Sequence, residues 1–147
     1  MAKNLKTALI ASFIGMLIAT SWLFDASSFS QELSRDEIIM GQISEGLNLS
    51  AGVAAAINEF FHEHGRFPQD NSEAGIVEPI GILGKYVISV TIGAGDGSIT
   101  IEYGNDADPI ISGATLTLRA TIKEPRPVWF CSGDYIHPKY YPINCNL

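Results

Sequence analysis

The chain has 147 residues, of which 46% are hydrophobic and 17% are charged, and its formal net charge at pH 7 is −7. This length accommodates one domain with its own core and a short terminal segment. The negative charge excludes general binding to nucleic acid or anionic lipid, because both repel an acidic surface.

An uncharged stretch runs from Thr7 to Phe24 near the start of the chain. As a helix it would be about 27 Å long, close to the roughly 30 Å of the hydrocarbon core of a bilayer. Two lysines precede it and Asp25 follows it, an asymmetry that predicts export of everything after Phe24. We therefore expect residues 1–24 to be a membrane anchor or a signal peptide. Without these two lysines the formal charge changes from −7 to −9.

Two outcomes of export remain open. Ser28 and Ser30 before Gln31 fit the small residues of a cleavage site, which would release the domain. Trp22 and Phe24 suit the membrane interface and favour an uncleaved anchor that contacts the membrane through residues 7–24.

A single long helix is predicted after a polar connector at residues 25–33. The sequence Ser34-Arg-Asp-Glu37 has the form of a capping box, and apolar residues then recur every three or four positions up to Phe61. Gly65 supplies a left-handed stop and Pro68 follows it. This pattern predicts a helix of about 30 residues.

The second half of the chain predicts a sheet. Residues 70–84 are rich in Gly, Asn, Ser and Pro and indicate a surface loop, after which the apolar period changes to two. Four strands are expected, at residues 86–92, 98–103, 115–122 and 128–131. Short connections favour an antiparallel meander with the helix on one face, so the predicted fold class is α+β, with one domain at residues 34–147.

The two cysteines, Cys131 and Cys145, lie close to the C-terminus. In an exported protein they predict a disulfide that closes a C-terminal loop of about 15 residues, worth roughly 3 kcal/mol. The alternatives are two unpaired thiols or half of a metal site. No nearby histidine and cysteine spacing fits zinc, so we expect the disulfide.

Motifs for catalysis are missing from the sequence. Glu59 and His62 have the spacing of one di-iron ligand pair, but that site needs a second such pair on a facing helix. Phosphate loops, nucleophile elbows and dinucleotide fingerprints do not occur. We therefore expect no enzymatic activity, no metal and no cofactor.

Aromatic and basic residues gather in the C-terminal loop. They are candidates for stacking on sugars or bases: Tyr135, Lys139, Tyr140 and Tyr141. The alternative, which we favour, is that they pack the loop against Trp129.

Several segments in chain order resemble the globular domain of bacterial type IV pilins. These segments are Gln42–Ser50, Glu59–Pro68, Asp70-Asn71, Gly84–Val90, Ala114–Leu118, Val128–Cys131 and Lys139–Cys145. The resemblance implies a long N-terminal helix packed on an antiparallel sheet, with the disulfide-bounded loop as an exposed edge. It also implies a structural subunit of filaments that serve adhesion, motility or DNA uptake, with other pilin or pilus-assembly subunits as partners.

The first residues differ from the pilin pattern. Pilins carry a basic leader cut after glycine, with glutamate as the fifth mature residue, whereas a cut at Gly15-Met16 would place Thr20 there. Acidic residues from Asp25 onward add charge that is costly in an apolar filament core.

From these features we expect a pilin-like structural protein of the bacterial envelope. It would be anchored in the inner membrane with its domain in the periplasm, or lie in or at the pilus, as a subunit or accessory of a type IV pilus system. The alternative is a free periplasmic or secreted pilin-fold binding module that does not polymerise.

Overall fold

The computed structural model describes residues 33–123 and 126–141. The described residues from Ser34 onward form one compact unit. Its elements, in chain order, are helix α2 (Arg35–His64), 3-10 turn η1 (Pro79–Gly81), strands β1 (Val87–Ile92), β2 (Ser98–Tyr103), β3 (Thr115–Lys123) and β4 (Arg126–Asp134), and 3-10 turn η2 (Pro138–Tyr140). The predicted α+β class is confirmed.

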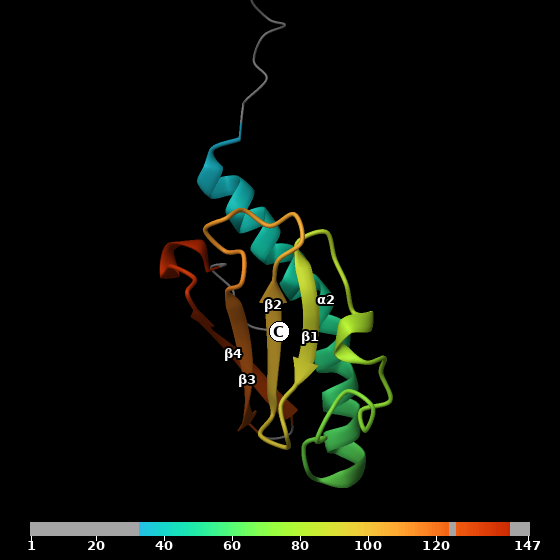
Figure 1. Cartoon of the computed structure of the whole chain (residues 1–147). Helices are drawn as coiled ribbons and strands as arrows, with labels where there is room; N and C mark the ends of the chain where they lie inside the picture. Colours follow the sequence, from blue (N-terminus) through green and yellow to red (C-terminus); the bar gives the residue numbers. More distant parts are fainter. Residues whose placement is uncertain (1–32, 124–125, 142–147) are drawn as a thin grey trace, which may run out of the picture. The chain divides into compact units, whose positions relative to one another are not determined.

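The four strands form one antiparallel sheet in the order β1-β2-β3-β4, which confirms the predicted meander. Helix α2 lies along one face of this sheet and contacts β1, β2 and β4 (Figure 1). Strand β4 is longer than the predicted 128–131, because its pairing with β3 continues to Thr115 opposite Asp134.

Helix α2 begins and ends at the residues that the sequence predicts. The Ser34 hydroxyl accepts a hydrogen bond from the Glu37 backbone N–H at 3.3 Å, and the Glu37 carboxylate accepts one from the Ser34 N–H at 2.7 Å. At the other end Gly65 has φ 67° and donates to the Phe61 carbonyl at 2.8 Å. Both ends of α2 are therefore capped by hydrogen bonds to backbone or side-chain groups only a few residues away.

The core lies between α2 and the inner face of the sheet. Its fully buried side chains include Ile39, Ile43, Ile57, Val87, Val90, Ile99, Ile101, Tyr103, Leu116, Leu118 and Trp129. Complete burial of an apolar side chain of this size contributes about 1.5–3 kcal/mol, so this layer is the main source of stability.

Gly46 sets the closest approach between α2 and β2. A Cβ at this position would lie 2.8 Å from Cγ2 of Ile101 and 2.9 Å from the Tyr103 ring. The Tyr103 hydroxyl donates a hydrogen bond to the Ile43 carbonyl at 2.9 Å. Burial of this hydroxyl raises the pKa of Tyr103.

Within the described residues, no helix is long and apolar enough to cross a membrane. The predicted membrane segment, residues 7–24, lies outside the described residues, as do most of the connector and Cys145.

Candidate interaction surface

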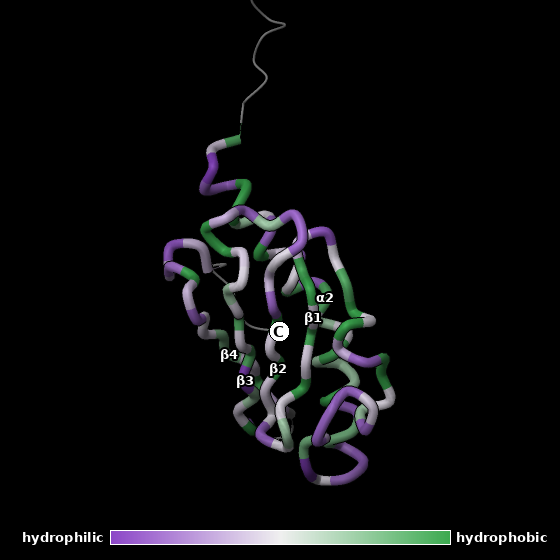
Figure 2. Tube along the Cα trace, viewed as in Figure 1, coloured by the Kyte–Doolittle hydropathy of each residue, from purple (hydrophilic) through white to green (hydrophobic). Residues whose placement is uncertain are grey.

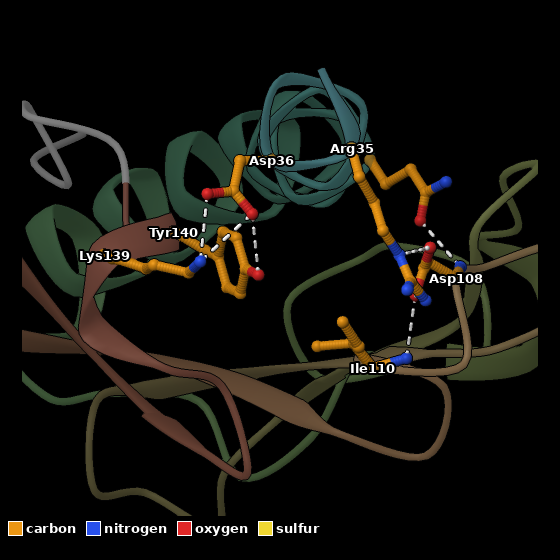
Figure 3. A network of polar contacts seen from close by, with 7 residues as sticks. Arg35, Asp36, Asp108, Ile110, Lys139 and Tyr140 are labelled. Atoms are coloured by element: carbon orange, nitrogen blue, oxygen red, sulfur yellow. Dashed lines mark hydrogen bonds and ion pairs between the residues drawn. The ribbon is translucent and has the colours of Figure 1, made fainter.

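The start of α2 is held between two loops (Figure 3). On one side Arg35 donates to both carboxylate oxygens of Asp108, in the β2–β3 loop, at 3.0 and 2.9 Å. On the other side Asp36 accepts from the Lys139 ammonium at 2.9 Å and from the Tyr140 hydroxyl at 3.0 Å, both in η2. We call these five residues the clasp.

The clasp is stabilised by opposite charges. Hydrogen bonds from Lys139 and Tyr140 lower the pKa of Asp36, and the Arg35 guanidinium lowers that of Asp108. The same contacts raise the pKa of Arg35 and Lys139. All four charged groups therefore hold their charges at neutral pH.

Three of the four candidate ligand-binding residues in the C-terminal loop make contacts within the domain. Tyr140 is 4% exposed, and Lys139 belongs to the clasp. The Tyr141 hydroxyl accepts from the Gly133 N–H at 2.7 Å and donates to its carbonyl at 3.2 Å. Tyr135 differs, since it is 91% exposed and has φ 63°. Of the four candidates, Tyr135 is therefore the one presented to solvent almost in full. The choice between ligand binding and packing of the loop against Trp129 stays a prediction.

Cys131 lies on β4 opposite Leu118 and is half-buried. Its predicted partner Cys145 is outside the described residues, so the disulfide stays a prediction.

Two polar side chains fix the loop between α2 and β1, and neither was predicted as a functional residue. The buried Asn71 amide donates to the carbonyls of Val77 and Val90 at 3.1 and 2.9 Å, and accepts from the Ile92 N–H at 2.8 Å. The Glu45 carboxylate accepts from the backbone N–H groups of Lys85 and Tyr86 at 2.9 and 2.7 Å. Glu45 and Asn71 fall within pilin-like segments of the sequence, which was the available signal.

An apolar groove lies between α2 and this loop. It has a volume of about 430 Å³ and is lined by Leu49, Gly52, Val53, Gly75, Ile76, Val77 and Ile82. In the same loop, Val77 of the groove lining is 60% exposed, and Ile80 and Leu83 are 74% and 58% exposed. Figure 2 shows hydrophobic stretches in this loop around η1, whereas the part of the loop that directly follows α2 is mainly hydrophilic. Three exposed apolar side chains so close together in the sequence mark a candidate contact surface.

A second hollow, also of about 430 Å³, lies at the end of α2 and is lined partly by Glu59, Phe60 and His64. His64 stacks on Phe60 with ring centroids 4.1 Å apart, and its Nδ1 is 3.1 Å from the Phe60 carbonyl oxygen. No cluster of three potential metal ligands exists among residues 33–123 and 126–141.

Comparison with known proteins assigns the fold to a family. The sequence model for pilin, a bacterial filament protein, matches residues 41–146. The chain belongs to the pilin family.

Three pilin relatives are each 33% identical to this chain over the residues that align. Fimbrial protein EcpC of Eikenella corrodens is 33% identical over 114 residues, which are 76% of this chain and 72% of that protein. Type IV major pilin protein PilE of Neisseria gonorrhoeae is 33% identical over 97 residues, 66% of this chain and 58% of its own length. A fimbrial protein of Neisseria meningitidis is also 33% identical, over 56% of its length. The chain thus spans less than two thirds of either neisserial pilin.

Because pilins are filament proteins, membership of this family indicates that the protein has a structural role in the cell envelope or the pilus. It also indicates other pilin subunits as partners.

Proposed function

We propose that this pilin-family protein is a subunit or accessory of a type IV pilus system that serves adhesion, motility or DNA uptake. The observation that carries the proposal is the match of residues 41–146 to pilin together with α2 packed on a four-stranded meander. No catalytic residue takes part, and the protein acts through its surfaces.

The domain contributes two surfaces suited to protein contacts. The apolar loop with Val77, Ile80 and Leu83 supports packing against another subunit, because exposed apolar side chains gain most from burial. Tyr135 supports a contact at the C-terminal loop, since it is exposed and tyrosine is enriched at protein interfaces.

Residues 7–24 tether the protein to the inner membrane, with the domain on the periplasmic side. Support comes from the uncharged stretch between the N-terminal lysines and Asp25. In this arrangement the protein works beside a filament or caps it. Acidic residues close behind the apolar stretch are costly to bury among apolar helices, which opposes a place as the principal filament subunit.

Cell fractionation with N-terminal sequencing of the native protein tests this proposal. The expected result is an intact Met1 in the membrane fraction and only a minor band in sheared surface filaments. Gln31 as first residue would instead support the free binding module. A methylated Met16, or the protein as the main filament band, would contradict the accessory role and identify a polymerising pilin.

A further inference from the structure

The first turn of α2 has no apolar attachment to the sheet. Every side chain from Arg35 to Ile38 is exposed, and the first buried side chain is Ile39, at 0% exposure. Further along, Ile43, Val53 and Ile57 are each 3% exposed or less. The first turn therefore depends on the clasp, whereas the rest of α2 depends on the core.

Three of the four charged side chains of the clasp are exposed to water and ions. The side chains of Arg35, Asp36 and Lys139 are 61%, 54% and 49% exposed, and Asp108 is 14% exposed. Ion pairs at such exposure contribute little to stability and are weakened by salt. Docking of the first turn should therefore be sensitive to ionic strength in a way that the apolar core is not.

Gly41 lies directly after this segment, and packing does not explain it. It is exposed, and no described atom outside its own helix lies within 4 Å of the position that a Cβ would occupy. Gly46 differs, because Tyr103 fills that position. Glycine inside a helix is less favourable than alanine, so an exposed glycine without a packing role is a local weak point.

We propose that Ser34–Met40 is a hinged segment, which leaves the sheet when the clasp opens and bends at Gly41 while the remaining domain stays folded. Opening exposes Ile39 but no other fully buried side chain of α2, so the closed form predominates and the open form is a minor state. This inference does not depend on the proposed pilus role.

Hydrogen exchange on the full-length protein in detergent tests the proposal. The reporters are the amides of residues 38–41, of which Ile38 donates to the Ser34 carbonyl at 3.1 Å, and the amides of residues 54–57 are the internal reference. Raising the salt from about 0.1 M to about 1 M shortens the screening length from about 10 Å to about 3 Å. Exchange at residues 38–41 should become several-fold faster, with residues 54–57 unchanged.

Two sets of variants distinguish the effect of the clasp on hydrogen exchange from the effect of Gly41. Arg35→Gln combined with Asp36→Asn should give the high-salt exchange pattern already at low salt and leave the Tm of the domain nearly unchanged. Gly41→Ala should slow exchange at residues 38–41 by about fivefold, the factor that corresponds to about 1 kcal/mol of helix propensity. Gly52→Ala is the matched control, since Gly52 is also exposed with no described neighbour within 4 Å.

Two results would overturn the inference. If the double variant accelerates exchange equally at residues 38–41 and 54–57, or lowers the Tm strongly, the clasp belongs to the cooperative core. If Gly41→Ala and Gly52→Ala slow exchange at residues 38–41 to the same extent, Gly41 is not a hinge.

Discussion

Single polar side chains hold the long loop in place together with the loop's own apolar contacts to the core, which come from Phe67, Ala74, Ile76 and Ile82. The Asn71 amide bonds to Val90 and Ile92 of the edge strand β1, which occupies backbone groups that would otherwise face away from the sheet. An unpaired buried group of this kind costs about 1–3 kcal/mol, so one asparagine has a large effect on the path of the loop.

Glu73 makes the stability of the same loop depend on pH. The Arg66 guanidinium, at 2.6 Å, and the Gln69 N–H, also at 2.6 Å, lower the pKa of Glu73 from its ordinary 4.5 to about 2. A depressed pKa means that the ionised form stabilises the folded state. This contribution is complete above pH 4.5 and is lost as the pH falls towards 2.

We therefore expect Glu73→Gln to lower the Tm at pH 7 but to have almost no effect near pH 2, where Glu73 itself becomes neutral. Thermal unfolding followed across this range measures the difference from the wild type. Glu63→Gln is the control, because Glu63 is exposed and makes no ion pair with any described residue. A Tm difference that stays constant with pH would contradict the assignment to Arg66.

At the scale of elements, the contact between α2 and β2 is set by the absence of a side chain at Gly46. The helix backbone lies directly against the Tyr103 ring, and the Tyr103 hydroxyl bonds to the Ile43 carbonyl. Gly46 and Tyr103 thus fix the distance between the helix and the sheet at this point. A larger residue at either position would force the two elements apart.

Gly46→Ala should therefore destabilise the domain by about 1–3 kcal/mol, despite the higher helix propensity of alanine, because its methyl group overlaps Ile101 and Tyr103. Gly52→Ala, in the open part of the same helix, should stabilise it by up to about 1 kcal/mol. Chemical denaturation of both variants measures the two free energies. Equal stabilisation by the two alanines would show that α2 does not lie this close to β2.

At the scale of the whole molecule, the predicted Cys131–Cys145 disulfide would join β4 to the C-terminus. Cys131 lies on the strand that closes one edge of the sheet. A cross-link there restricts the unfolded chain and keeps the last residues near the domain, at a gain of several kcal/mol in small exported domains.

Replacing Cys131 by Ser should lower the free energy of unfolding by about 2–5 kcal/mol and reduce the amount of protein that accumulates in the envelope. Cys145→Ser should have the same effect, and the double variant should be no worse than either single one. Thermal unfolding with and without reductant provides the measurement. Insensitivity of the wild type to reductant would show that the bond is missing or without effect.

The sequence by itself determined the elements of this pilin domain and their order. Ser34 with Glu37, and Gly65, define the ends of α2 through bonds that span only a few residues, so a local pattern is sufficient. The strands β1, β2 and β3 were predictable for the same reason, because apolar and polar residues alternate within each of them. The extra length of β4 was not, since it depends on pairing with β3.

Only the tertiary structure decided what the polar side chains do. Arg35 and Asp108 are 73 positions apart in the chain, and Asp36 and Lys139 are 103 apart. Sequence spacing predicts partners only within one helix or hairpin, so neither the clasp nor the role of Asn71 could be derived from it. The sequence offers Lys139 as a candidate for ligand contact or for loop packing, and the folded domain adds its bond to Asp36 at the start of α2, which spacing alone does not predict.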